Sequence, residues 1–409
     1  MKTMIDADTV LSTPRAGQGT SAGIRDLVWC EIDLDALGRN IQTIRSLVGE
    51  RTRVAPVVKG NAYGHGLLLA ARAFRDAGAD WLCVHALDEA RALRNAGFTL
   101  PIYILGPIPP EGLEEALRLQ ARLVLYTLEQ VAVLAEVVRR TGLSARVHLK
   151  LETGNNRQGV PIEQAIPLAD ACVANGLVVE GLASHLANVE DTTDHRFAQE
   201  QFRRFREAAG ILRRAGHPLP ILHIANSAAT LLWPEAHFDM VRVGIAAYGL
   251  WPSRETFVSA LLAKGRPVEL VPALTWKTRI VQLKDVPVGD YVGYGCTFRT
   301  THPTRLAILP IGYFDGYPRA LSNQAHVLVH GVRAPVRGRV CMNLTMVDVT
   351  DIPQAALHDE VVVLGRQGGE GISAEAIAEW AGTINYEIVS RIGEHVPRME
   401  VASSRAGGG

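Results

Sequence analysis

Short apolar, β-branched runs alternate with longer stretches of helical periodicity between about residue 54 and residue 245. This alternation is typical of parallel strands that are joined by helices. Eight such runs can be counted: VAPVVK (54–59), WLCVHA (81–86), IYILG (102–106), ARLVLY (121–126), RVHLKLE (146–152), VEGLASH (179–185), ILHIAN (221–226) and MVRVGI (240–245). Eight strands in this pattern predict a (β/α)8 barrel of the TIM type, although an open doubly wound sheet would show the same alternation.

The pattern changes after about residue 266. Strand-like runs bounded by Gly, Pro and Asp follow, namely LTWKTRIVQL, TRLAILPIG, HVLVHG, RAPVRG, TMVDVT and EVVVLG, with one late helix near SAEAIAEWAG. Residues 1–27 lack an apolar run of signal-peptide length. We therefore expect a disordered leader over 1–27, an α/β barrel over 28–266 and a mostly antiparallel C-terminal β domain over 267–409.

The overall composition narrows the class of partner. The 42 basic residues balance the 42 acidic ones, so the chain has no basic excess to attract nucleic acid or anionic lipid. No apolar stretch approaches the ~20 residues of a membrane span. The five cysteines are odd in number and form no CxxC pair, which disfavours a disulfide framework or a structural zinc site. We expect a cytoplasmic protein that acts on a small molecule.

Polar residues gather where the predicted barrel strands end. Functional groups of such barrels lie on the loops after the carboxyl ends of the strands, and phosphate often binds after strands seven and eight. These positions are occupied by Lys59, Lys150, Arg157, His185, His223, Asn226, Ser227, Arg242, Gly244 and Ile245. The pattern predicts that they share one face, and it shows no cluster of carboxylates and histidines at metal-ligand spacing.

Lys59 ends an apolar strand, where partial desolvation would lower the pKa of its amine and favour imine formation. A snorkelling surface lysine is the alternative. The segment GNAYGHG follows, and its three glycines allow the backbone to approach a ligand. Tyr63 in this segment could hydrogen-bond a phosphate or simply cap the barrel mouth.

The segment VVKGNAYGHG closely resembles the cofactor-lysine motif of the alanine racemases. The resemblance continues, in the order of that family, through KLETGNNRQG, HIANSAA, VRVGIAAYGL, VGYGCTF, IGYFDGY, GRVCMN and INYE. It covers the chain from Trp29 to about Met399. The resemblance implies a (β/α)8 barrel followed by a β domain, pyridoxal 5′-phosphate as cofactor, a homodimer with shared active sites, and D-alanine production for peptidoglycan.

The resemblance also assigns two bases. Lys59 is similar to the Schiff-base lysine, which also acts on the Cα proton of the D-enantiomer, and Tyr294 is similar to the opposite base, supplied by the partner subunit. Racemisation removes a proton on one face and returns it on the other, so two bases on opposite sides suit it. From the residues alone, a strand-turn aromatic between two glycines is the preferred interpretation of Tyr294.

Further roles concern the ring and the phosphate of the cofactor. Arg242 resembles the arginine that faces the pyridine nitrogen; it stays protonated, so the cofactor becomes a weaker electron sink. The resemblance places His223 against this arginine and His185 beside the ring, although strand-end histidines are also common core residues. It assigns the phosphate to Ser227 beside Asn226, to the backbone of Gly244 and Ile245, and to the hydroxyls of Tyr63 and Tyr386. Ser227 could equally be an ordinary N-cap.

The substrate carboxylate is assigned to Arg157, whose guanidinium suits a planar carboxylate. Lys150 is similar to a lysine that is carbamylated in many relatives and orients that arginine. The backbone at Met342 would complete the site from the second subunit, and Tyr313 would narrow the access channel.

The motifs depart from the common family pattern at two positions. ETGNNR stands where many relatives have DTGMGR, and Asn343 stands where many have Asp. Serine racemases and broad-specificity racemases share the fold, so both remain alternatives to alanine. A basic amino-acid decarboxylase is disfavoured because it needs an acidic group in the place of Arg242. A non-catalytic cofactor carrier is disfavoured by the second domain, and a metal-dependent hydrolase by the strand ends.

Overall fold

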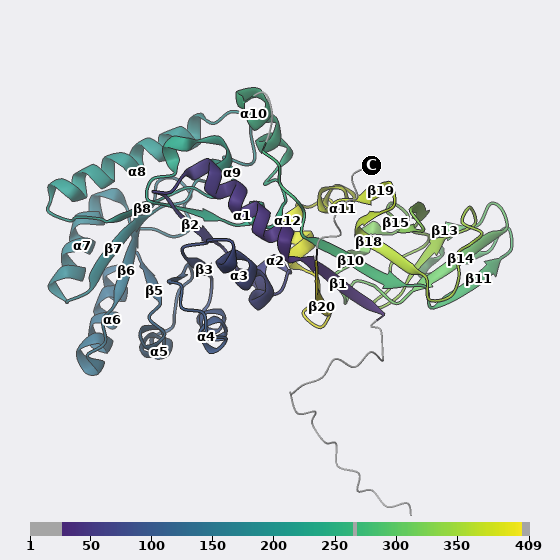
Figure 1. Cartoon of the computed structure of the whole chain (residues 1–409), viewed down its shortest axis with the longest axis horizontal. Helices are drawn as coiled ribbons and strands as arrows, with labels where there is room; N and C mark the ends of the chain where they lie inside the picture. Colours follow the sequence, from purple (N-terminus) through teal and green to yellow (C-terminus); the bar gives the residue numbers. More distant parts are fainter. Residues whose placement is uncertain (1–26, 265–267, 403–409) are drawn as a thin grey trace, which may run out of the picture.

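The structure is a computed structural model that describes residues 27–264 and 268–402. The expected leader, residues 1–27, lies outside the described residues except for its last member. The described part forms two units, a parallel barrel and an antiparallel β domain, which Figure 1 shows on the left and on the right.

Eight short parallel strands form the barrel. They are β2 (Arg53–Pro56), β3 (Leu82–Val84), β4 (Ile102–Ile104), β5 (Arg122–Leu125), β6 (Arg146–Lys150), β7 (Val178–Ala183), β8 (Ile221–His223) and β9 (Met240–Val243). β3 to β8 make one sheet and β2 pairs with β9. A parallel bridge between Val57 and Cys83 joins β2 to β3, while Arg242 N donates to Ala225 O across the β8–β9 seam. The predicted barrel is confirmed, with all eight strands within the predicted runs to about one residue.

Helices cover the outside of the barrel. They are α1 (Leu34–Val48), α3 (Leu67–Asp76), α4 (Leu87–Asn95), α5 (Leu113–Arg118), α6 (Leu128–Thr141), α7 (Ala165–Ala174), α8 (Arg196–Arg214), α9 (Ser227–Leu232) and α10 (Arg254–Lys264). α6 shows how local sequence sets their ends, because Thr127 and Gln130 form a capping box and Gly142 takes the left-handed C-cap. Its buried face carries Val131 and Leu134, four and seven residues after the N-cap.

Two antiparallel sheets dominate the C-terminal unit. One runs β16-β15-β18-β10-β1-β20 with β19 on β18, and the other runs β11-β14-β17. Their bounds are β10 (Leu274–Arg279), β11 (Gln282–Val286), β14 (Thr304–Leu309), β15 (His326–Val329), β16 (Val332–Pro335), β17 (Thr345–Asp348), β18 (Glu360–Gln367), β19 (Glu370–Ile372) and β20 (Arg398–Val401), beside the short pair β12 (Tyr291–Val292) and β13 (Phe298–Arg299). The single predicted run LTWKTRIVQL is therefore two strands, which belong to different sheets.

The first strand departs from the expected domain boundary. We expected residues 28–266 to form the barrel, but β1 (Val28–Asp33) pairs with β10 antiparallel and with β20 parallel. The barrel closes on its own eight strands and offers no free edge, whereas β10 pairs with β18 on one side and accepts β1 on the other. The chain therefore begins in the C-terminal sheet and enters the barrel through α1.

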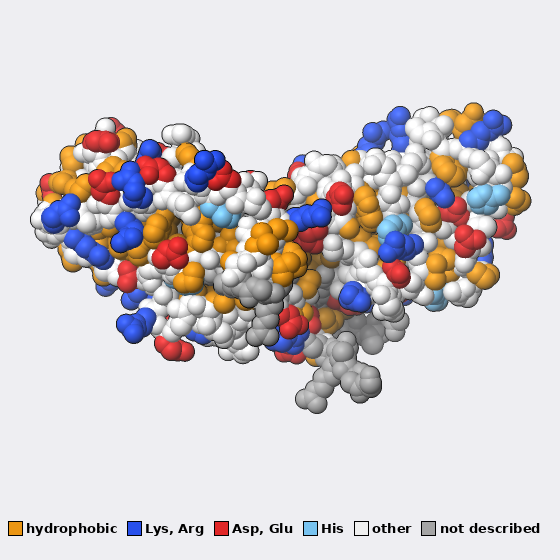
Figure 2. Space-filling view, turned by 90° about the horizontal axis from the view of Figure 1, so that it is seen from above, with side chains coloured by type: hydrophobic (Ala, Val, Ile, Leu, Met, Phe, Trp, Pro, Cys, Tyr) orange, Lys and Arg blue, Asp and Glu red, His pale blue; other side chains and the backbone are white. Residues whose placement is uncertain are grey.

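Two short helices connect the C-terminal unit to the barrel mouth. The late helix predicted near SAEAIAEWAG is α11 (Ala374–Ala381), and α12 (Asn385–Ser390) follows it. α12 lies beside the short helical segment α2 (Lys59–Tyr63) at the junction of the two units (Figure 1). The space-filling view shows acidic and basic side chains interspersed over one face (Figure 2). Among the described residues, no helix is long and apolar enough to cross a membrane.

Candidate active site

A cavity of about 940 Å³ opens at the carboxyl ends of the barrel strands. Most of the predicted residues line it: Lys59, Tyr63, Lys150, Arg157, His185, Asn226, Ser227, Arg242, Gly244, Ile245 and Tyr386. His223 lies behind Arg242, in contact with it. Tyr294, Tyr313 and Met342 do not line the cavity.

Lys59 lies shortly after the end of β2, and the backbone that follows it is left-handed. The next four residues all have positive φ, from 61° at Gly60 to 52° at Tyr63. A non-glycine residue in this left-handed conformation costs about 1–2 kcal/mol, so the turn needs support. Glu89 on α4 supplies it, because its Oε1 accepts the N–H of Gly60 at 2.7 Å and its Oε2 accepts that of His85 at 2.8 Å.

The amine of Lys59 is accessible from the open cavity but is surrounded by protein on the other sides. Burial lowers its pKa most, the positive charge of Arg157 lowers it further, and the carboxylate of Glu89 opposes both. A lysine with a lowered pKa is more often neutral and nucleophilic near neutral pH. The accessibility and the lowered pKa of Lys59 therefore suit its amine to attack a carbonyl carbon.

A small polar pocket lies at the ends of β8 and β9. Ser227 begins α9, and its Oγ accepts the N–H groups of Gly244 at 3.0 Å and Ala246 at 3.4 Å. The N-cap of α9 is Asn226, whose Oδ1 accepts the N–H of Ala229, so Ser227 is not the cap. Ser227, Gly244 and Ile245 line the cavity, and their hydroxyl and backbone groups suit an anion.

Tyr386 reaches this pocket from α12, so the second unit completes the first. Its hydroxyl donates to Oε2 of Glu190 at 2.8 Å. Burial raises the pKa of Glu190, and the nearby Asp191 raises it further, against the hydrogen bond from Tyr386. Sequence inspection missed Glu190, which lies in an irregular loop after β7 with no motif or periodicity to mark it.

Arg242 is almost fully buried on β9, and its guanidinium is held on several sides. NH1 donates to Nδ1 of His223 at 2.5 Å, and NH2 donates to the carbonyl oxygen of Ser184 at 2.7 Å. His185 lies 3.5 Å from NH2, and burial together with the charge of Arg242 holds its pKa well below the usual value. His185 is therefore neutral, and Arg242 is the cation of this part of the cavity.

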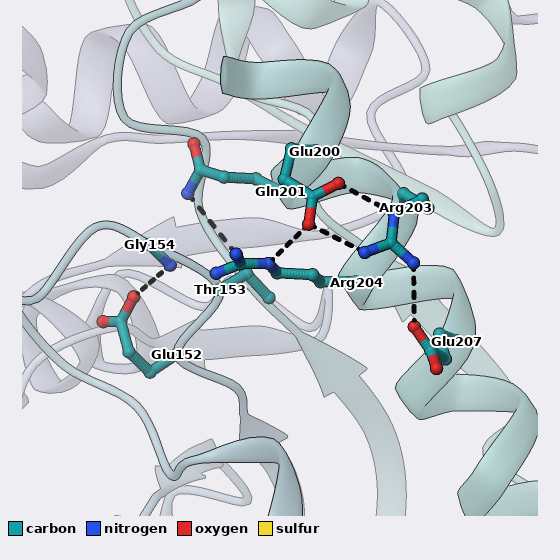
Figure 3. A network of polar contacts seen from close by, with 8 residues as sticks. All are labelled: Glu152, Thr153, Gly154, Glu200, Gln201, Arg203, Arg204 and Glu207. Carbon is teal, nitrogen blue, oxygen red and sulfur yellow. Dashed lines mark hydrogen bonds and ion pairs between the residues drawn. The ribbon is translucent and has the colours of Figure 1, made fainter. Parts of the chain in front are cut away.

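The loop after β6 carries the expected substrate-binding group. Glu152 folds back over this loop, where its Oε1 accepts the N–H groups of Gly154 at 2.5 Å and Asn155 at 2.6 Å (Figure 3). Its Oε2 accepts the backbone N–H of Arg157 at 3.3 Å, which leaves the Arg157 side chain open to the cavity. The same figure shows Gln201 of α8 bonded to Thr153, which ties the loop to the barrel wall.

Lys150 lies deeper in the cavity. Its Nζ donates to Oε1 of Gln158 at 3.2 Å, a contact that sequence inspection did not anticipate. Burial lowers the pKa of Lys150 most, and the charges of Arg242 and Arg157 lower it further, to about 8. About a tenth of this amine is therefore neutral at pH 7, far more than of an ordinary lysine.

Three predicted residues, Tyr294, Tyr313 and Met342, lie exposed on the C-terminal unit instead of in the cavity. Their exposed fractions are 74%, 43% and 54%. Phe314 N donates to Met342 O and Tyr313 N to Cys341 O, so two of the three sit on bonded segments. Asn343 is also exposed, directly after Met342.

Among the described residues, no group of three or more His, Cys, Asp or Glu side chains could hold a metal ion. The cavity lining carries amines, guanidinium groups, hydroxyls, imidazoles and carboxylates.

Comparisons with known proteins agree on one family. A model described as "Alanine racemase, N-terminal domain" matches residues 32–252, and one described as "Alanine racemase, C-terminal domain" matches residues 273–400. The alanine racemase of Desulforamulus reducens is 41% identical over 380 residues, covering 92% of this chain and all of that protein. The alanine racemase of Syntrophobacter fumaroxidans is 44% identical over 369 residues, or 90% and 96% of the two chains.

Solved structures of alanine racemases are also similar to this chain. The alanine racemase from Bacillus anthracis with bound L-Ala-P has a TM-score of 0.87 at 35% identity, covering 93% of this chain and 97% of that one. The alanine racemase from the D-cycloserine producer Streptomyces lavendulae has a TM-score of 0.86 at 36% identity, with coverage of 93% and 98%.

Proposed function

Because the chain belongs to the alanine racemase family, we propose that it interconverts L-alanine and D-alanine with pyridoxal 5′-phosphate in the barrel cavity, and so supplies D-alanine for peptidoglycan. The observation that carries the proposal is the convergence of Lys59, Arg242 and Ser227 on one cavity. An amine, a cation and an anion pocket are the three groups that an aldehyde, a pyridine nitrogen and a phosphate require.

The donor set fits this cofactor. Lys59 is the amine that would hold its aldehyde carbon, and the hydroxyls of Ser227, Tyr63 and Tyr386 lie around the anion pocket with the backbone of Gly244 and Ile245. The backbone at Gly244 leaves space that a side chain would fill, because an added Cβ would stand 2.5 Å from the Tyr63 hydroxyl oxygen. When bound, pyridoxal 5′-phosphate supplies an electron sink that acidifies the Cα proton of an attached amino acid.

Racemisation requires two proton-transfer groups, one on each face of the substrate. Lys59, with its lowered pKa, removes or returns the proton on one face. We assign the other face to Tyr294 of the partner subunit. This assignment is supported by the high exposure of Tyr294 and by its absence from the cavity of its own chain. It makes the active form a homodimer with two shared sites.

The remaining residues bind and orient. Arg242 donates only, so it keeps the ring nitrogen unprotonated and restrains side reactions. His223 holds Arg242, and His185 packs beside the ring. Arg157 binds the substrate carboxylate, and Lys150, as a carbamate, orients Arg157. The partner subunit's Met342 completes the carboxylate site and the partner subunit's Tyr313 narrows the access channel.

The presence of Arg242 also favours racemisation over decarboxylation. A decarboxylase of this architecture needs an acidic partner for the ring nitrogen, and the groups around Arg242 are His223, His185 and backbone carbonyls. Racemisation of serine or of a broader range of amino acids has no such feature against it.

The decisive experiment is a panel of L-amino acids assayed for loss of optical activity with purified protein and cofactor. We expect alanine to react fastest and the visible absorbance of protein-bound cofactor to disappear in Lys59→Ala. A wild-type protein that stays colourless when saturated with cofactor would refute the cofactor. A clear preference for serine or for large side chains would refute the substrate.

A further inference from the structure

The interior of the barrel beneath Arg242 is polar, although such interiors are usually filled with branched apolar side chains. His223 on β8 and His148 on β6 have no exposed surface, and Glu180 on β7 is 9% exposed. Burying polar groups without good partners costs about 1–3 kcal/mol each. We call these three residues and Arg242 the interior network.

The members of this network contact one another in turn, from Arg242 through the two histidines to Glu180. Arg242 NH1 lies 2.5 Å from His223 Nδ1, and His223 Nε2 lies 2.7 Å from His148 Nδ1. His148 Nε2 lies 3.4 Å from Glu180 Oε2, an ion-pair distance without hydrogen-bond geometry. The network therefore runs from the proposed cofactor site to the opposite end of the barrel strands.

The chemistry of the two ends determines where the protons lie. A guanidinium can only donate, so its contact with His223 is favourable when His223 accepts at Nδ1 and, being neutral, carries its proton on Nε2. His148 then accepts at Nδ1 and carries its own proton on Nε2, facing the carboxylate of Glu180. Burial lowers the pKa of both histidines most, and the charge of Arg242 lowers it further; Glu180 opposes this shift at His148 without cancelling it, so the neutral form of both is favoured.

The far end of the network is a stable negative charge. Burial of Glu180 opposes its ionisation, but the nearby imidazole of His148 and the charge of Arg122 outweigh burial and lower its pKa to about 2. Arg122 Nε lies 3.1 Å and Arg146 NH1 3.2 Å from the carboxylate oxygens. Glu180 therefore acts only as an acceptor toward His148 at physiological pH.

The packing leaves His148 little freedom to turn. Its ring lies 4.7 Å from that of Tyr103 and 5.7 Å from that of Trp81, measured between centroids. A Cβ added to Gly181 would stand 2.5 Å from His148 Nδ1 and 2.7 Å from the carbonyl oxygen of Ile221. A glycine at this position of β7 is thus needed to admit the imidazole.

We propose that Glu180 is a positioning residue for Arg242, acting through His148 and His223. It selects the Nε2–H tautomer of both histidines, so that His223 always presents a lone pair to the guanidinium. If His148 carried its proton on Nδ1, His223 would have to accept at Nε2 and carry a proton on Nδ1, facing another donor. The inference rests on the proposed function, in which Arg242 faces the ring nitrogen of the cofactor.

The test uses holoenzyme labelled with [15N]histidine, with the His148 and His223 signals assigned by their loss in His148→Gln and His223→Gln. We expect both imidazoles of the wild type to be neutral and in the single Nε2–H form. In Glu180→Leu we expect mixed tautomers at both. Partners that orient a functional ligand typically change activity ~10–100-fold, so kcat for L-alanine should fall by that order. KM should stay within about twofold, since Arg157 is untouched.

Two further variants keep the result interpretable. Glu180→Gln offers both a donor and an acceptor to His148, so it should also give mixed tautomers. If Glu180→Leu does not fold, the tautomers of Glu180→Gln test the proposal in its place. Asp348→Asn is the matched control: it removes a buried carboxylate, paired with Arg337 at 3.3 Å, from the C-terminal unit. It should lower thermal stability and leave the tautomers and kcat unchanged.

The proposal is overturned if the glutamate variants keep single Nε2–H tautomers, whether or not kcat falls, or if mixed tautomers leave kcat unchanged. Failure of the proposed function looks different. In that case wild-type protein neither binds the cofactor nor racemises alanine, while the tautomers can still be observed.

Discussion

The hydroxyl of Tyr63 lies directly against the backbone of Gly244, so close that a Cβ added to Gly244 would stand 2.5 Å from the phenol oxygen. The two residues belong to the loops after the first and last barrel strands, which are neighbours through the β2–β9 pairing. Tyr63 is also packed against the ring of Tyr248 at a centroid distance of 5.0 Å. Tyr63 therefore forms one wall of the anion pocket, and its packing leaves no space for a side chain at position 244.

Gly244→Ala should weaken cofactor binding for this reason. The new methyl group must displace Tyr63 or shift the backbone that faces the anion, and overpacking of this kind costs about 1–3 kcal/mol. We expect the dissociation constant for pyridoxal 5′-phosphate to rise by about tenfold or more. A spectrophotometric titration of cofactor-free protein measures it.

Gly210→Ala is the control for this variant. Gly210 lies in α8, and its added Cβ would meet only the flexible end of Arg214 at 3.3 Å. Replacing a helical glycine by alanine should be neutral or stabilise the fold by about 0.5–1 kcal/mol. Equal cofactor affinity in both alanine variants would contradict the proposed role of Gly244.

Mixed dimers test whether Tyr294 acts on the neighbouring subunit. Lys59→Ala and Tyr294→Phe should each be nearly inactive as homodimers. After the two proteins are mixed and allowed to exchange subunits, each heterodimer contains one site with both native groups. With random exchange, about a quarter of the wild-type activity should return, because half of the dimers carry one good site of two.

The same mixture gives a clear negative result. If Tyr294 served the cavity of its own chain, every site in the heterodimer would lack one group, and mixing would restore nothing. Mixing Lys59→Ala with Lys59→Ala/Tyr294→Phe provides the background rate.

The lowered pKa of Lys150 predicts a pH-dependent stability. Its pKa is about 8 in the folded protein against 10.5 for an ordinary lysine side chain, so between these pH values the unfolded chain binds more protons. The unfolding free energy contributed by this residue therefore rises with pH over that window, and below it the buried charge is destabilising. Lys150→Met should stabilise the protein by up to about 3 kcal/mol near neutral pH, and the gain should vanish above about pH 10.5.

Denaturant titrations at several pH values, in buffer freed of carbon dioxide, measure this difference. Lys284→Met is the control, because Lys284 is exposed on β11. A pH-independent difference between Lys150→Met and wild type would contradict the assignment.

Carbon dioxide should react with Lys150. A neutral amine adds to it to form a carbamate and releases one proton, and the lowered pKa increases the neutral fraction of this side chain. With [13C]bicarbonate we expect a carbamate carbonyl signal in the NMR spectrum that is lost in Lys150→Met and kept in Lys284→Met. A signal that survives in Lys150→Met would place the carbamate elsewhere.

The barrel strands could be predicted from sequence because each is a local pattern of apolar residues, and the eight predicted runs contain the eight strands to within about one residue. The course of the first strand could not. Val28–Asp33 has strand character of its own, but nothing in it indicates that it pairs with β10 and β20, more than 240 residues away in the chain.

The site shows the same division. Lys59, Ser227 and Arg242 stand at strand ends, so counting strands places them in one cavity. Glu89, Glu190 and Gln158 follow no such rule, because they contact the site by folding back from helices and loops. The roles drawn from the resemblance, such as those of Tyr294 and Lys150, stay predictions.

The sequence by itself determined the barrel, the antiparallel second unit and the set of reactive side chains, since strand periodicity and residue type are local properties. Only the tertiary structure decided that Tyr63 is pressed against Gly244, that Tyr386 reaches Glu190, and that His148 and Glu180 lie beneath Arg242. Those contacts join residues far apart in the chain, and they arise when the sheet closes and the second unit docks on the barrel mouth.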